Sequence, residues 1–146
     1  MVSAKKKLET FASGFQALSE PSRLRMMALL ADAGQELCVC ELVDALEEPQ
    51  YHVSRSLKIL EKGGWVIARR EGKWVYFGLP SELDRVQELV IKAISAIPKD
   101  LLAQDRRELG RRLKLRDNSK SVIGVQKTYL LSRRTSGDHA SAKALK

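Results

Sequence analysis

The chain's only two cysteines stand one residue apart, in the stretch Leu37-Cys38-Val39-Cys40-Glu41-Leu42. Deprotonated thiols bind soft, thiophilic ions and react with oxidants, so a close pair of them has chemistry that most side chains lack. A lone cysteine is usually a small packed side chain, because free cysteine behaves as a hydrophobe. The pairing, beside Glu41 and Asp44 in an otherwise cysteine-free chain, favours a sulfur-based binding site. Cys38 and Cys40 are therefore the candidate metal-binding residues.

The number of sulfur donors limits which ligand the pair can hold. Structural zinc commonly takes four ligands, often from more widely spaced cysteine pairs, whereas this chain offers two sulfurs. A trigonal thiophilic centre, As(III) or Sb(III), needs fewer ligands, and a small thiol or hydroxide from solution could supply the third. No histidine stands near the pair except His52. A trigonal thiophilic centre such as As(III) or Sb(III) therefore suits the pair better than structural zinc, and no resident cofactor is expected.

The cysteines fall at the start of a helix predicted over residues 39–46. Side chains two residues apart on a helix point about 200° apart, so one small ion cannot take both sulfurs while that turn stays helical. Binding is expected to distort or unwind the turn from Cys38 to Cys40. Because this helix supports the next one along the chain, the distortion should move that neighbour too.

Apolar periodicity predicts a mainly α fold with one small β-hairpin. Helices are predicted over residues 5–18, 21–33, 39–46, 50–62 and 81–97, and strands over residues 65–70 and 73–77. A tight turn at Glu71-Gly72 joins the strands. Two short helices followed by a hairpin form a winged helix-turn-helix. The apolar face of the fifth helix has little to cover within one chain, so we expect it to pack with the first helix in a homodimer.

The predicted helix over residues 50–62 has the character of a DNA-recognition helix. Val53, Leu57 and Leu60 face inward, while the outward side chains carry groups suited to base edges and phosphates. The predicted DNA-binding set on this helix is Gln50, Tyr51, His52, Ser54, Arg55 and Lys58. The hairpin adds three basic residues that could follow phosphates or a minor groove, namely Arg69, Arg70 and Lys73. The alternative is a solvated helix and hairpin used for protein contacts.

The net charge of +8 lies entirely in the C-terminal third. Residues 1–98 hold 13 basic and 13 acidic residues, and residues 99–146 hold 13 and 5, a difference of +8. We divide the chain into a winged-helix DNA-binding and dimerisation domain, residues 1–98, and a basic extension, residues 99–146. The extension is expected to be helical at first and flexible beyond Arg116, except for a short segment around residues 122–131. No stretch approaches the roughly 18 apolar residues of a membrane span, and no apolar signal core follows the N-terminus, so we expect a cytoplasmic protein.

Residues 11–80 resemble the ArsR/SmtB family of bacterial metal-responsive repressors. The likeness is carried by Phe15 to Arg25, by Glu36 to Leu42, and by Val53 to Leu60 with the wing Arg70 to Tyr76. The resemblance implies a homodimeric repressor, not an enzyme, that binds an inverted repeat in double-stranded operator DNA. It also implies that a toxic metal or metalloid releases the DNA, and that the Cys-x-Cys stretch is the metal site.

Departures from the family pattern bear on the inducer. Arsenic sensors of this type often carry a third cysteine where this chain has Val43. Cadmium or lead sensors recruit cysteines from an N-terminal arm, and zinc-type members use Asp, His and Glu on the last helix. This chain has no cysteine in its N-terminal segment and no histidine in residues 81–98.

We therefore expect a repressor regulated by As(III) or Sb(III). The alternatives are a cadmium- or lead-responsive repressor and a repressor that senses oxidants or reactive sulfur. A thiol–disulfide enzyme would usually carry a Cys-x-x-Cys motif, which the sequence lacks.

Overall fold

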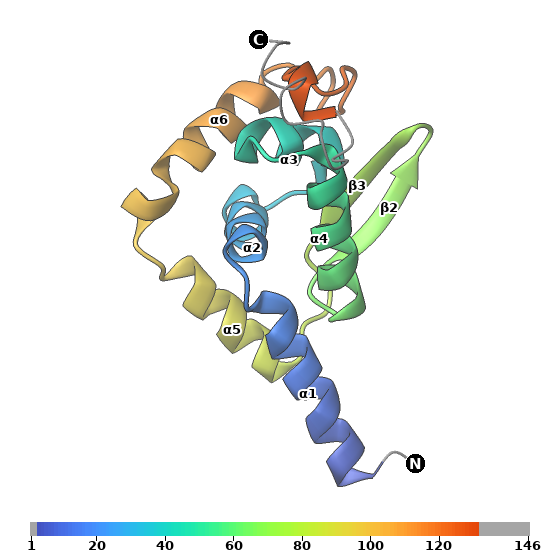
Figure 1. The fold of residues 1–146 in the computed structure, drawn as a ribbon, viewed down its shortest axis with the longest axis vertical. Helices are drawn as coiled ribbons and strands as arrows, with labels where there is room; N and C mark the ends of the chain where they lie inside the picture. The colour runs from blue at the N-terminus through green and yellow to red at the C-terminus, as the bar shows by residue number, and fades with distance from the viewer. Residues whose placement is uncertain (1–2, 132–146) are drawn as a thin grey trace, which may run out of the picture.

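Helices make up most of the fold, and a small sheet lies beside them (Figure 1). A computed structural model of the chain describes residues 3–131. The helices are α1 (Ala4–Leu18), α2 (Pro21–Ala33), α3 (Val39–Leu46), α4 (Gln50–Lys62), α5 (Arg85–Ser95) and α6 (Ala103–Leu113). The strands are β1 (Leu37–Cys38), β2 (Ile67–Glu71) and β3 (Trp74–Gly78), and the 3-10 turns are η1 (Lys99–Leu102) and η2 (Thr128–Leu131). The predicted fold class, mainly α with a winged helix-turn-helix, is confirmed.

Local capping sets where the helices begin and end. The Glu20 side chain accepts from the backbone N–H of Arg23 and starts α2, and Gly34 ends it in the left-handed conformation at φ 62°. The fifth helix begins at Arg85 rather than near residue 81, because the Asp84 and Gln87 side chains cap each other's backbone N–H groups. The sequence prediction placed that start four residues too early.

The sheet has three antiparallel strands in the order β1-β3-β2. The hairpin pairs Glu71 with Trp74, so its turn is Gly72-Lys73, one residue later than predicted, and Gly72 takes a left-handed φ of 61°. Strand β1 was not predicted, because two residues carry no periodic signal. It pairs Cys38 with Tyr76 and so holds Cys38 in an extended conformation.

The core is built around α2, which lies between α5 and the helix-turn-helix (Figure 1). Met26 and Leu30 of α2 are fully buried there. Val53, Leu57 and Leu60 of α4 are also fully buried, as the sequence predicts for the anchors of a recognition helix. Helix α4 is therefore fixed to the body along one face, and its other face is left toward solvent.

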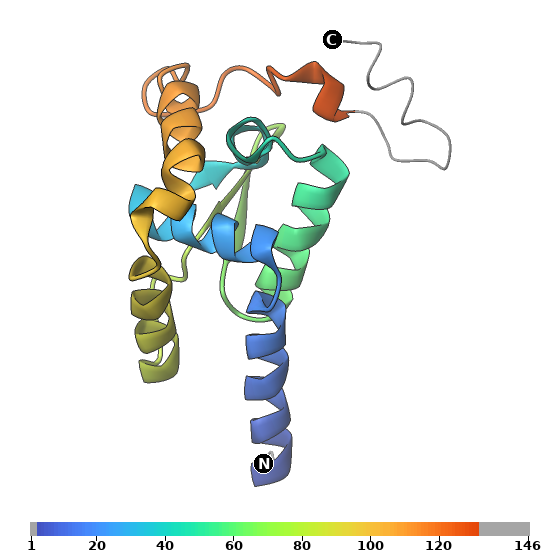
Figure 2. The same ribbon diagram turned by 60° about the vertical axis from the view of Figure 1, so that its left-hand side comes forward.

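The C-terminal extension packs onto the same body as far as residue 131. Helix α6 lies against α3, and Leu109 and Leu130 join the core formed by the rest of the chain (Figures 1 and 2). Arg25 of α2 bonds both carboxylate oxygens of Asp105 at 2.8 Å. After Arg116, Ser121 bonds Tyr76 and Gln126 bonds Asp44, so this stretch contacts the body as well; the division of the chain at residue 98 stays a prediction. Residues 132–146 lie outside the described part of the chain.

One face of α1 stays uncovered. Leu8, Phe11 and Phe15 are 69%, 44% and 45% exposed, and Leu89 on α5 is 48% exposed. The N-terminal half of α1 extends away from the other elements (Figure 2). Within residues 3–131, no helix combines the length and apolar character needed to cross a membrane.

Candidate functional site

The two cysteine sulfurs lie side by side at the start of α3. Their Sγ atoms are 3.1 Å apart, and both residues are buried free thiols. Cys38 is the N-cap of α3, with φ −75° and ψ 149°, so only Cys40 is helical. The predicted divergence of about 200° applies to two residues that are both helical, and it is wrong here. The sulfurs converge while the first turn of α3 remains intact.

The thiols differ in acidity because they share one hydrogen bond. The Cys40 thiol donates to Cys38, which stabilises a Cys38 thiolate and lowers the pKa of Cys38 to about 7 from 9.0. The backbone N–H of Cys40 also favours that thiolate. The same thiol–thiolate bond, together with burial, raises the pKa of Cys40. Cys38 is therefore the more nucleophilic sulfur near neutral pH.

Glu41 holds the N-terminus of α3 in place. Its carboxylate is fully buried and accepts from the backbone N–H of Cys38 at 2.8 Å. Arg116, from the segment after α6, donates to the same carboxylate through Nε and Nη2, both at 2.6 Å. The pKa of Arg116 is raised chiefly by this bond. An extension residue therefore balances a charge buried directly beside the thiols.

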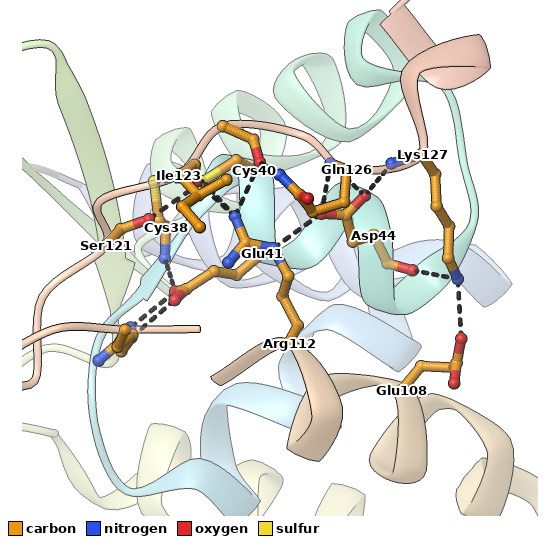
Figure 3. A network of polar contacts seen from close by, with 12 residues as sticks. Cys38, Cys40, Glu41, Asp44, Glu108, Arg112, Ser121, Ile123, Gln126 and Lys127 are labelled. Carbon is orange, nitrogen blue, oxygen red and sulfur yellow. Dashed lines mark hydrogen bonds and ion pairs between the residues drawn. The ribbon is translucent and has the colours of Figure 1, made fainter. Parts of the chain in front are cut away.

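Asp44, one turn further along α3, is held in the same way (Figure 3). Arg112 of α6 donates to it through Nε at 2.7 Å, and both side chains are 3% exposed. The backbone N–H groups of Gln126 and Lys127 donate to the Asp44 carboxylate as well. Asp44 thus fixes both α6 and the segment that follows it.

The segment over residues 117–127 closes over the thiols (Figure 3). Ser121 Oγ lies 3.4 Å from Cys40 Sγ, and the carbonyl oxygen of Ile123 lies 3.7 Å from it. Arg112 Nη2 is 3.5 Å from the same sulfur. The backbone N–H of Ser121 donates to the Tyr76 hydroxyl at 2.9 Å, which ties this segment to β3. Sequence reasoning missed Arg112, Arg116 and Ser121; the one available signal was the four-residue spacing of the two arginines.

A cleft of about 430 Å³ opens beside the thiols. Cys38 and Cys40 are among its lining residues, and Trp74, Val75 and Val125 add apolar side chains to the lining. The cleft is also lined by three members of the predicted DNA-binding set, namely Gln50, Ser54 and Lys73. The sulfur pair and part of the predicted DNA-reading surface therefore share one space.

The predicted DNA-binding residues of α4 differ in their solvent exposure and in their contacts with neighbouring side chains. Gln50, Arg55 and Lys58 are exposed, and Tyr51 and Ser54 are half-buried. The Arg55 guanidinium lies 6.0 Å from the centre of the Tyr51 ring. His52 is turned toward the body, where Nδ1 lies 2.6 Å from a carboxylate oxygen of Glu48.

The predicted DNA-binding residues of the wing also differ in their side-chain contacts. Arg70 and Lys73 are exposed, and Lys73 lies 4.9 Å from the centre of the Trp74 ring. Arg69 stacks 4.8 Å from the Tyr76 ring and donates to Glu36 at 2.8 Å. Arg69 therefore braces the sheet, whereas Arg70 and Lys73 can reach outward.

Comparison with known proteins identifies the family. The sequence model of a protein family, described as "Bacterial regulatory protein, arsR family", matches residues 20–68 of this chain. A transcriptional regulator of the helix-turn-helix type from Methanocaldococcus jannaschii is 42% identical over 84 residues, which are 58% of this chain and 91% of the relative. The chain belongs to the ArsR family. An arsenic resistance transcriptional regulator of Pseudomonas putida is 38% identical to this ArsR-family chain over 91 residues, 62% of this chain and 70% of the relative.

Membership makes this ArsR-family protein a helix-turn-helix transcriptional regulator of a DNA-binding, non-enzymatic family. A cadmium resistance regulatory protein homologue of Staphylococcus aureus also matches, 38% identical over 82 residues, 56% of this chain and 65% of the relative. Relatives named for arsenic and for cadmium thus match over similar lengths. Similarity to these relatives therefore does not distinguish arsenic from cadmium as the ligand.

Proposed function

We propose that this protein is a transcriptional repressor that releases operator DNA when As(III) or Sb(III) binds Cys38 and Cys40. The observation that carries the proposal is the 3.1 Å separation of the two buried sulfurs. One ion can bond both sulfurs without unwinding α3. Trivalent arsenic and antimony are thiophilic and make three bonds, so two sulfurs and one donor from solution complete their coordination.

The sulfur separation favours a trivalent centre over structural zinc. An ion bonded to each sulfur at about 2.3 Å would hold sulfurs 3.1 Å apart at an angle of about 85°. Tetrahedral zinc prefers about 109° and commonly four ligands. Among residues 3–131 there is no group of three or more His, Cys, Asp and Glu side chains placed to hold a metal ion. A pyramidal centre tolerates the narrower angle and needs one donor fewer.

The shared cleft supplies the proposed route from inducer to DNA. An occupant bonded to the thiols shares this cleft with Gln50 and Ser54 of α4 and with Lys73 of the wing. An inducer that binds more tightly to a conformation unable to bind DNA shifts the protein toward that conformation. The coupling free energy between two such sites is typically about 1–3 kcal/mol. Inducer binding is therefore proposed to weaken DNA binding by changing the position of α4 relative to the wing.

The DNA-facing surface and the dimer complete the proposal. Gln50, Tyr51, Ser54 and Arg55 read base edges, while the wing and Lys58 contact phosphates. The exposed apolar faces of α1 and α5 pair with a second copy, so that two recognition helices match an inverted repeat in double-stranded DNA. We place the protein in the cytoplasm, where such DNA and reduced thiols are found.

Oxidant sensing is the second candidate. It is favoured by the pKa of Cys38, near 7, because thiolates are the form that oxidants attack. Cadmium or lead sensing has less support, because it calls for more sulfur donors than the two in the chain.

The test is a gel-shift assay on DNA from upstream of the protein's own gene. Arsenite, antimonite, cadmium, zinc and peroxide are compared as releasing agents. The proposal expects release at the lowest concentrations with arsenite and antimonite. Release by cadmium alone, or by peroxide with a mass change at the cysteines, would replace it with one of the alternatives.

A further inference from the structure

Two sulfurs leave a trivalent metalloid one bond short. When arsenous acid reacts with two thiols, each thiol proton leaves with one hydroxyl as water, two As–S bonds form, and the third hydroxyl stays on arsenic. No electron is transferred. The buried site must therefore accept a polar oxygen next to Cys38 and Cys40, and an oxygen taken out of water needs hydrogen-bond partners.

Arg112 offers an unused donor at this place. The residue is 4% exposed, and its Nε and Nη2 are engaged by Asp44 and by the carbonyls of Ile123 and Gly124. Its Nη1 is the one buried side-chain nitrogen or oxygen without a hydrogen-bond partner among residues 3–131. Buried N–H groups are nearly always satisfied. Nη1 belongs to the same guanidinium as Nη2, which lies 3.5 Å from Cys40 Sγ, so the free donor is part of the group that contacts the sulfur (Figure 3).

Ser121 brings a second polar group to the same sulfur. The residue is 2% exposed, and its Oγ lies 3.4 Å from Cys40 Sγ. Its backbone N–H is fixed by the Tyr76 hydroxyl, so the side chain is held over the thiols. A hydroxyl can donate or accept, and it suits a metalloid-bound oxygen in either role.

We propose that Arg112 and Ser121 complete a mixed sulfur–oxygen site by hydrogen-bonding the oxygen that As(III) or Sb(III) retains after bonding Cys38 and Cys40. This inference rests on the proposed function and deepens it. Both residues lie outside residues 20–68, the region matched by the family model. The C-terminal extension therefore sets the ligand preference, through oxygen recognition rather than a third sulfur.

The donor character of Arg112 adds a preference between inducers. A guanidinium stays protonated and cannot itself ligate an ion. With its charge paired by Asp44, it acts here as a hydrogen-bond donor, which suits the hydroxide oxygen of As(III) and finds no acceptor on a bare Cd(II) ion. The site is thus selective for an oxygen-bearing metalloid over a bare cation.

Ser121→Ala and a second arsenical test the inference. Phenylarsine oxide carries a carbon substituent on arsenic, so two sulfurs saturate it and no oxygen needs recognition. The 430 Å³ cleft has room for the ring, since a cavity of about 150 Å³ can hold benzene. Thr128→Ala is the matched control, because it deletes an exposed hydroxyl from the same extension. Release of operator DNA by each arsenical is measured for the three proteins.

The inference expects Ser121→Ala to raise the arsenite concentration for half-release by roughly fivefold, the effect of one hydrogen bond. Release by phenylarsine oxide stays unchanged, and Thr128→Ala behaves like the parent with both arsenicals. Equal responses of Ser121→Ala and Thr128→Ala to arsenite would overturn the inference, as would equal weakening of Ser121→Ala toward both arsenicals. If neither arsenical releases the unmodified protein, the proposed function has failed instead.

X-ray absorption of the arsenite-loaded full chain, in buffer without thiols, gives an independent readout. The inference expects two sulfur neighbours and one oxygen neighbour around arsenic. Three sulfur neighbours would overturn it, because the third could come only from another protein chain.

Discussion

Arg116→Met should destabilise the protein far more than its position in a basic, polar segment indicates. Arg116 is 9% exposed in its side chain and makes two 2.6 Å bonds to Glu41, which is fully buried. Methionine keeps much of the aliphatic stem but removes the charge, so the Glu41 carboxylate loses its only cationic partner among residues 3–131. Breaking one side of a buried pair typically costs about 3–5 kcal/mol.

Urea unfolding followed by circular dichroism measures this effect. With a denaturant slope of about 2 kcal/mol per molar, the midpoint should fall by roughly 2 M. Arg111→Met is the matched control, because Arg111 also pairs with a carboxylate, that of Glu108 at 3.0 Å, but is 76% exposed. That surface pair should be worth less than about 1 kcal/mol.

A second variant tests the cause of the loss. Glu41→Gln together with Arg116→Met removes both charges and should recover a substantial part of the stability lost in the single variant. If Arg116→Met and Arg111→Met shift the midpoint equally, the extension does not hold the start of α3 through a buried charge. The account of how the thiols are positioned would then be wrong.

Three further outcomes are expected. Arg55→Ala should weaken binding to the operator by about 1–3 kcal/mol more than binding to unrelated DNA, measured by competition gel-shift; equal losses would make Arg55 a phosphate contact. The ultraviolet absorbance of the Cys38 thiolate should titrate near pH 7, and at a higher pH in the Cys40→Ala variant. Because the pKa of Cys38 in the folded protein lies below 9.0, this thiolate adds stability above about pH 9, and that stability is lost as the pH falls through 7. A free energy of unfolding that rises toward acid pH would contradict the assignment. Phe11→Asp should shift the protein from dimer to monomer in sedimentation velocity, since Phe11 is 44% exposed on α1; an unchanged sedimentation coefficient would place any dimer contact elsewhere.

The sequence predicted well those features that depend on neighbouring residues. The bounds of α4 follow from Pro49 before it, Gly63 after it and the apolar spacing between them. The hairpin follows from β-branched and aromatic residues on both sides of Gly72. Such signals lie within a few residues of the structure they determine.

The convergence of the thiols could not be predicted in this way. It depends on β1, a two-residue strand whose partner, β3, lies far along the chain. Once Cys38 is extended by that pairing, the helical angle between side chains no longer applies. The predicted divergence of the two side chains was an error of this kind.

The role of the extension was hidden for a similar reason. Arg112 and Arg116 are two of many basic residues in the extension, and their partners stand 68 and 75 residues upstream. A single sequence does not show which arginine meets a buried carboxylate across such a separation. The cover over the thiols therefore emerged only from the three-dimensional arrangement.

Fluorescence anisotropy of labelled upstream DNA, titrated with arsenite, tests the central claim most directly. The unmodified protein should release the DNA as about one As(III) binds per subunit. Cys38→Ser and Cys40→Ser should bind the DNA as tightly as the unmodified protein and retain it at the same arsenite concentrations. Release from both serine variants at unchanged arsenite concentrations would contradict the claim that this sulfur pair is where the inducer binds.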